Sequence, residues 1–93
     1  MTTTQTQQVK WDDAALGKFN RMITRIPMFH REIAKVVVQK KALQNATQRG
    51  AALVEEQDIV NAFFSEVPKA FYSLMVRLLD EAGFHYKEQD AKR

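Results

Sequence analysis

The sequence predicts an all-α fold: a compact single domain of four helices with a long second helix. Apolar residues recur at spacings of three and four along most of the chain, as on the buried face of a helix. Two prolines follow β-branched residues, at Ile26–Pro27 and Val67–Pro68, where each is expected to end one helix and start another. No segment of useful length alternates as a strand does, and no repeat of roughly 20 to 50 residues is visible.

The composition is typical of one globular domain. The chain has 93 residues, of which 45% are hydrophobic, enough for a single core. It has no cysteine, which excludes disulfides and thiolate metal sites and fits a reducing compartment. The N-terminal segment has no apolar signal region, and no apolar run approaches the ~20 residues of a membrane span. We therefore expect a cytoplasmic protein without membrane insertion.

The first helix is expected to follow Asp12, a good N-cap residue. Residues 1–10 are mainly polar and are predicted to be a flexible lead, so the helical domain spans residues 11–84. Trp11 and Leu16 occupy the two positions of a hydrophobic staple around Asp12. The predicted buried stripe of this helix consists of Leu16, Phe19, Met22, Ile23 and Ile26.

The second helix is expected to start with Pro27 at its first position and to run for about twenty residues to Gly50, which can serve as a C-cap. Its predicted buried stripe consists of Phe29, Ile33, Val36, Val37 and Leu43, with Ala34, Val38 and Ala46 at the edge. The opposite surface holds Arg31, Lys35, Lys41 and Arg49. His30 is expected to face water in the first turn.

The third and fourth helices follow a short link, Ala51–Val54, that is expected to be extended. Acidic residues then favour a helix start by their attraction to its positive end: Glu55, Glu56 and Asp58. The third helix has a broad apolar face of Ile59, Val60, Ala62, Phe63 and Phe64. The fourth, after Pro68, has Phe71, Leu74, Met75, Leu78, Leu79 and Ala82. Gly83 is predicted to be its left-handed C-cap with Phe84 folding back, before a flexible tail at 85–93.

Together these patterns predict one core. Its expected members are Trp11, Leu16, Phe19, Ile26, Phe29, Ile33, Val37, Ile59, Phe63, Leu74 and Leu78. On this prediction, truncation of Phe29 to alanine costs ~3 to 5 kcal/mol of stability.

Neither a catalytic site nor a cofactor or metal site is predicted. The two histidines, His30 and His85, lie in no metal-binding motif. The three glycines are spaced 33 residues apart and do not form a phosphate-binding loop. The carboxylates of Glu55, Glu56 and Asp58 cluster at a helix start, where their structural role suffices to explain them. An enzyme is therefore the least favoured class of function.

The positive charge is concentrated in the first half of the chain. Residues 1–50 carry nine Lys/Arg against three Asp/Glu, and residues 51–93 carry five against eight. Two oppositely charged halves that attract each other, or a neighbouring copy, explain this asymmetry. The alternative is a nucleic-acid interface on a basic helix face, although no aromatic residue is interleaved with the cations for base stacking. Its candidate residues are Arg21, Arg25, Arg31, Lys35 and Lys41.

A dispersed set of residues also resembles a known family. The set consists of Trp11, Ala15, Ile26, Pro27, Phe29, Arg31, Ala34, Gly50, Val54, Asp58 and Ala62. It is similar to the small domain at the C-terminal end of the B subunit of light-independent protochlorophyllide reductase, which also occurs as free-standing short bacterial proteins. The likeness covers residues 11–64; it lacks the threonine expected near Val54 and leaves out the fourth helix.

The resemblance implies a non-enzymatic accessory domain that acts through protein contacts, beside a tetrapyrrole-reducing enzyme, and that helps to cover a tetrapyrrole. The iron–sulfur clusters of that family cannot be held by a chain without cysteine. A looser likeness, in element order alone, is to the histone fold: helix, long helix, extended link, helix. It implies a homodimer paired through the long helix, and it underlies the alternative function, a histone-like DNA-binding protein.

Overall fold

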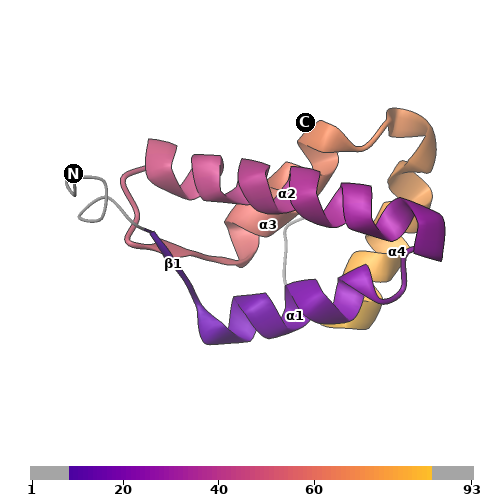
Figure 1. Ribbon diagram of the computed structural model, residues 1–93, viewed down its shortest axis with the longest axis horizontal. Helices are drawn as coiled ribbons and strands as arrows, with labels where there is room; N and C mark the ends of the chain where they lie inside the picture. The colour runs from indigo at the N-terminus through magenta and orange to yellow at the C-terminus, as the bar shows by residue number, and fades with distance from the viewer. Residues whose placement is uncertain (1–8, 85–93) are drawn as a thin grey trace.

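The structure, a computed structural model, describes residues 9–84, so the predicted tail at 85–93 and the lead at 1–8 lie outside the described residues. The described part confirms the all-α class (Figure 1). The helices are α1 (Asp13–Ile23), α2 (Met28–Gln48), α3 (Glu56–Glu66) and α4 (Tyr72–Ala82), with a 3₁₀ turn η2 (Lys69–Phe71) before α4. The two short strands are β1 (Lys10–Trp11) and β2 (Leu53–Val54).

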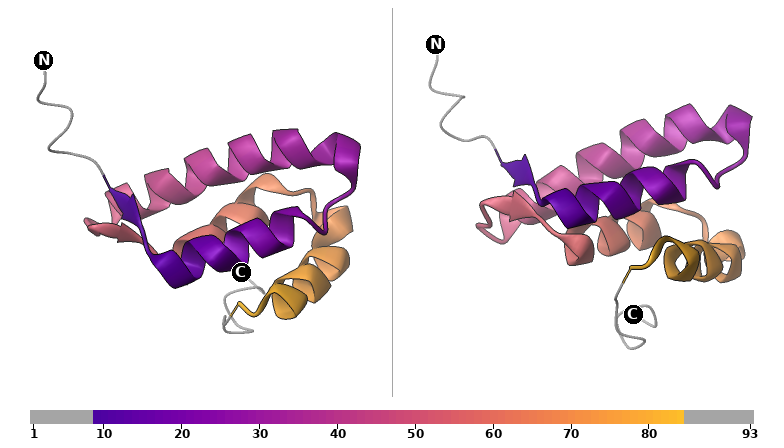
Figure 2. Two further views of the ribbon diagram at one scale, coloured as in Figure 1. Left: turned by 60° about the horizontal axis from the view of Figure 1, so that its bottom comes forward. Right: turned by 90° about the horizontal axis from the view of Figure 1, so that it is seen from below.

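The four helices enclose a single core. The most extensive helix pair is α2 with α3, and α1 packs against α4. Both views in Figure 2 place α2 along one edge of the molecule and α4 along the opposite edge, with α1 and α3 between them. One side of α2 therefore faces the core, and the other faces away from the rest of the domain.

Aromatic rings form the centre of the core. Phe19 of α1 and Phe63 of α3 are buried with ring centroids 6.1 Å apart, and Trp11 packs against Phe19 at 5.4 Å. The predicted core residues Ile26, Ile59 and Leu78 are also buried. The core predicted for α1, α3 and α4 is thus largely confirmed.

The helix ends follow the predicted chemistry. The Asp12 carboxylate accepts a hydrogen bond from the Ala15 N–H at 3.0 Å, so Asp12 is the N-cap of α1. Gly50 and Gly83 both have positive φ, 73° and 91°. Gly83 directly follows α4, and Gly50 follows α2 with Arg49 between them. Phe84 is buried and its N–H donates to the Leu79 carbonyl at 3.0 Å, which completes a Schellman motif. The helix α2 begins at Met28, so Pro27 is its N-cap and not its first residue as predicted.

The two strands correct one boundary. β1 and β2 pair in parallel with Lys10 opposite Leu53 and Trp11 opposite Val54. The Asp12 N–H donates to the Val54 carbonyl at 3.0 Å. Lys10, predicted to belong to the flexible lead, therefore lies in a strand. A ladder of two residues is too short to produce an alternating pattern, which is why the sequence did not indicate β1.

The predicted buried face of α2 is wrong. Phe29, Ile33 and Val36 are 80%, 68% and 60% exposed, and Val37 and Leu43 are also exposed. The buried residues of α2 are instead Val38, Ala42 and Ala46, with Ala34 half-buried. These four follow one another at intervals of four, and their small side chains let α3 approach closely. Because the helix turns by about 100° per residue, the bulky set points to the other side.

Two further residues predicted to lie in the core, Leu16 and Leu74, are exposed, and so is Phe71 on the predicted apolar face of the fourth helix. In α1, Leu16 is exposed and Ala15 takes the buried position beside Phe19. Phe71 and Leu74, at the start of the fourth helical segment, are exposed as well. Burial in α4 begins at Met75, where the helix meets the rest of the core.

We expect Phe63→Ala and Phe29→Ala to differ widely in stability. Phe63 is fully buried, so its truncation leaves a cavity and costs about 3 to 5 kcal/mol. Phe29 faces solvent, so its truncation changes the unfolding free energy by less than about 0.5 kcal/mol. Urea denaturation of both variants in dilute solution measures these costs. Equal costs would place Phe29 in the core after all.

Candidate protein-interaction surface

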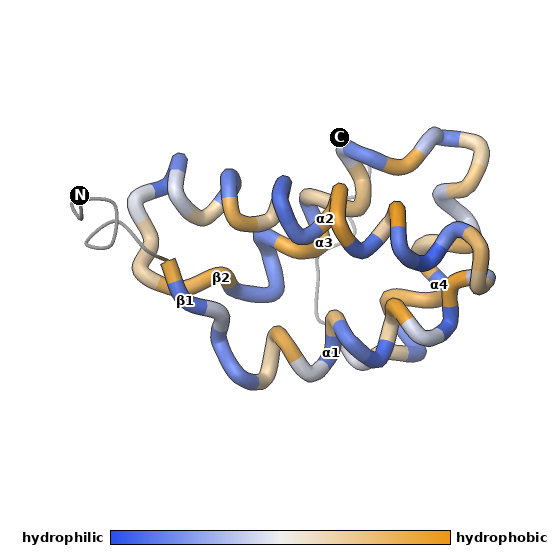
Figure 3. The backbone as a smooth tube through the Cα atoms, viewed as in Figure 1, coloured by the Kyte–Doolittle hydropathy of each residue, from blue (hydrophilic) through white to orange (hydrophobic). Residues whose placement is uncertain are grey.

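The outward side of α2 carries a row of exposed residues that we call the α2 stripe. Its members are Phe29, Ile33, Val36, Lys40 and Leu43, at alternating intervals of four and three. This alternation is the a/d spacing of a helix that packs along another helix. Met28 extends the exposed apolar surface at the N-terminal end, with 76% of its area accessible. Figure 3 shows hydrophobic and hydrophilic positions alternating along the whole of α2.

A shallow groove runs beside the α2 stripe, between α2 and the C-terminal end of α3. It consists of two open cavities of about 410 and 210 Å³ that share Val37 and Glu66 in their lining. The larger one is also lined by Val36, Lys40, Lys41 and Gln44. The smaller one is also lined by His30, Ile33, Ala34, Val38, Val67 and Pro68. The groove thus has an apolar floor, with cations on α2 and a carboxylate on α3 at its rim.

An aromatic ring contact lies at the N-terminal end of the α2 stripe. His30 is exposed, as predicted, and its ring lies 4.5 Å from that of Phe29 between centroids. Within residues 9–84, no three His, Asp or Glu side chains are placed to hold a metal ion. In the same part of the chain, no helix has the length and hydropathy needed to cross a membrane.

Three of the five cations of the nucleic-acid alternative contact other parts of the fold. Arg31 donates to the carbonyls of Thr24 at 2.9 Å and Ile26 at 3.1 Å, so it binds the main chain of the turn that follows α1. Arg25 pairs with Glu81 at 3.1 Å. Arg21 lies against the end of α4, with its Nε 3.4 Å from the Ala82 carbonyl oxygen. These three arginines therefore have partners within the fold.

The two lysines of that set lie on α2 but on different sides of it. Lys35 is exposed, whereas Lys41 is half-buried in the groove. Because they are six residues apart, their side chains leave the helix axis about 120° from each other. These two lysines therefore do not share one face of α2.

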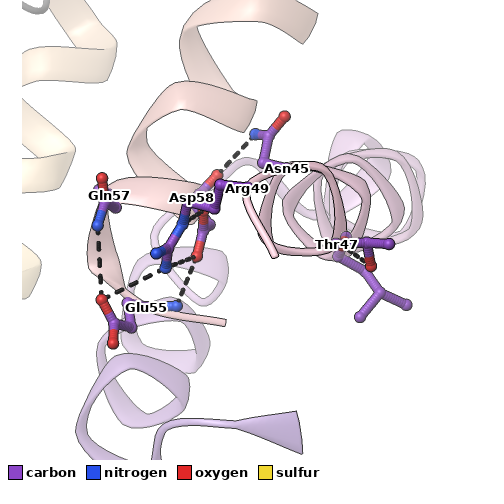
Figure 4. A network of polar contacts seen from close by, with 7 residues as sticks. Asn45, Thr47, Arg49, Glu55, Gln57 and Asp58 are labelled. Atoms are coloured by element: carbon purple, nitrogen blue, oxygen red, sulfur yellow. Dashed lines mark hydrogen bonds and ion pairs between the residues drawn. The ribbon is translucent and has the colours of Figure 1, made fainter. Parts of the chain in front are cut away.

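A network at the junction of α2 and α3 was not predicted. Arg49, expected on the outer surface of α2, donates to both carboxylate oxygens of Asp58 at 2.8 Å and lies 3.3 Å from Glu55 (Figure 4). These hydrogen bonds to Asp58 raise the pKa of Arg49. Asn45 donates to the Asp58 main-chain carbonyl at 3.0 Å. The network ties the end of α2 to the start of α3.

Asp58 is buried, and both oxygens of its carboxylate accept hydrogen bonds in this network. Its Oδ2 accepts the Glu55 N–H at 2.9 Å, and Glu55 caps α3 in return, which forms a capping box. The signal in the sequence was the interval of three between Glu55 and Asp58. The role of the network is structural, because the Asp58 carboxylate is already bound by Arg49 and the main chain.

We expect Asp58→Ala to lower the unfolding free energy by about 2 to 3 kcal/mol, since it removes the Asp58 half of the α3 capping box and the partner of Arg49. For a domain of this size, the melting temperature should fall by about 10 to 20 °C. Asp58→Asn keeps an acceptor for the Glu55 N–H and should lose less. The matched control is Asp13→Ala in the exposed first turn of α1, with a cost below about 1 kcal/mol. Equal melting temperatures for the two alanine variants would contradict the structural role.

Comparisons with models of known protein families, with curated proteins and with solved structures give no significant match for this chain.

Proposed function

We propose that this protein is a non-enzymatic interaction domain that binds another protein chain through the α2 stripe and the groove beside it. The observation that carries the proposal is the exposure of Met28, Phe29, Ile33 and Val36 together on one helix, in a domain whose core is already filled by other residues. Contiguous exposed apolar surface of this kind marks an interaction site.

The chemistry of the surface indicates the kind of partner. The α2 stripe repeats with the spacing of helix-to-helix contacts, so a helix from the partner fits along it. The apolar side chains supply binding energy through burial. Lys40, Lys41 and Glu66 at the groove contribute charges of both signs, which orient the partner.

The finer expectation names the setting of this contact. The resemblance of residues 11–64 to the protochlorophyllide reductase module supports an accessory role beside a tetrapyrrole-reducing enzyme. In that setting, the α2 stripe is the surface that meets the enzyme or covers its pigment. This part of the proposal rests on the sequence resemblance, and the surface itself is proposed independently of it.

Site-specific photo-crosslinking tests the interaction surface. We expect benzoylphenylalanine at position 29 to form covalent adducts with a protein chain in the cells that produce this protein, because Phe29 is the most exposed member of the stripe. The control places the same group at Leu74, an exposed apolar residue of α4 on the opposite edge. Adducts at neither position, or equal adducts at both, would overturn the proposal.

The nucleic-acid alternative predicts a different result in a salt titration. Several phosphate contacts would make DNA affinity fall steeply between low and physiological salt. Because Arg21, Arg25 and Arg31 have partners within the fold, we expect weak DNA binding at either salt concentration. A gel-shift titration measures this directly. Tight binding at low salt that is lost in Arg31→Ala or Lys35→Ala would favour the alternative.

A further inference from the structure

The α2 stripe has the chemistry to receive a second copy of itself. We propose that two copies of this chain pair through their α2 helices, antiparallel, about a two-fold axis between Ile33 and Val36. The inference rests on the proposed function, since it names the occupant of the same surface. Three features carry it: the position of the exposed apolar residues, the distribution of charge along α2, and the free edge that α2 forms.

The exposed apolar residues locate the axis. The most exposed ones, Met28, Phe29, Ile33 and Val36, lie in the N-terminal half of α2. A two-fold axis between Ile33 and Val36 places Ile33 of each copy opposite Val36 of the other. The four β-branched side chains then form the apolar centre of the interface. A two-fold interface uses one patch twice, so a single exposed patch is sufficient.

The same register fixes what lies at the ends of the interface. One turn outward, Phe29 of each copy comes opposite Lys40 of the other. The methylene stem of lysine covers apolar surface well, and its ammonium is attracted to the face of an aromatic ring. Glu32 follows Phe29 by three residues on the same helix and is exposed, so its carboxylate lies beside this ammonium. At each end of the interface, the Lys40 ammonium of one copy therefore lies near the Phe29 ring and the Glu32 carboxylate of the other.

Charge selects the antiparallel arrangement over the parallel one. In a parallel pair in register, Lys40 of one copy meets Lys40 of the other, and Glu32 meets Glu32. In the antiparallel pair, each Lys40 lies opposite Phe29 of the other copy instead, with the Glu32 carboxylate beside it. Lys35, Lys41 and Glu66 flank the stripe and stay at the rim, where Glu66 offers Lys40 and Lys41 an opposite charge. Like charges that face each other across an interface oppose association.

The geometry also sets the strength of the pair. Figure 2 shows α2 along an edge of the molecule, so a second α2 approaches it without meeting α1 or α4. The contact from residue 28 to residue 41 is about 20 Å long at 1.5 Å per residue. We expect one helix face of this length to bury less area than the roughly 800 Å² per partner of a standard stable interface. We therefore expect a dimer that dissociates on dilution, with a Kd on the order of micromolar.

Sedimentation equilibrium of the full chain over a wide concentration range tests the pair. The wild type should shift from monomer to dimer as concentration rises. Val36→Glu, at an exposed position of the α2 stripe, should remain a monomer with an unchanged far-UV circular dichroism spectrum. Leu74→Glu, at an exposed position of α4, should dimerise as the wild type does. A wild type that stays monomeric up to roughly millimolar concentration, or a Val36→Glu dimer of wild-type affinity, would overturn the proposal.

A charge swap tests the register. Lys40→Glu should weaken the dimer by about tenfold, because two symmetric contacts become repulsive at once. The double variant Glu32→Lys, Lys40→Glu restores both contacts and should recover most of the wild-type affinity. No recovery would overturn the antiparallel register.

The photo-crosslink at position 29 separates this inference from the function on which it rests. An adduct with the mass of two copies of this chain supports the pair. An adduct with a different protein, together with a monomeric wild type, overturns the pair and leaves the interaction surface in place. The absence of any adduct overturns both.

Discussion

The close approach of α2 and α3 is the constraint on which the rest of the structure depends. It is made by a ladder of small residues, Ala34, Val38, Ala42 and Ala46, that face the core at every fourth position. A ladder at this interval forms a ridge that fits the grooves of a neighbouring helix. Because this face of α2 packs against α3, the bulky residues on its other side point outward. The exposed α2 stripe is thus a direct consequence of how the core is packed.

The fold class and the helix ends were largely predictable because they depend on local chemistry. The cap at Asp12 and the left-handed glycines at positions 50 and 83 involve only residues a few positions apart. The core of α3 was equally clear, since its apolar residues lie on the buried side and Asp58 is the one polar residue of this helix that is fully buried. Where one face of a helix is apolar and the other is polar, periodicity alone identifies the buried face.

The candidate surface was only half predictable. Periodicity correctly grouped Phe29, Ile33 and Val36 on one face of a helix, yet it assigned that face to the core, because larger apolar side chains are usually buried. Two of the competing core positions, Ala42 and Ala46, give a weak apolar signal although both are fully buried. Similarly, the partner of Asp58 lies across a turn, on Arg49, and such a contact is set by tertiary structure. Two apolar faces on one long helix indicate that one of them serves a second contact.

The network of Arg49, Glu55 and Asp58 has a consequence for the far side of α2. It clamps the end of that helix to the start of α3, while the small-residue ladder holds the two helices along their length. The backbone that supports the stripe is therefore rigid before any partner arrives. Association then costs little conformational entropy beyond the overall tumbling of the two bodies and the freezing of long side chains such as Lys40. A modest contact area can for this reason give a specific complex.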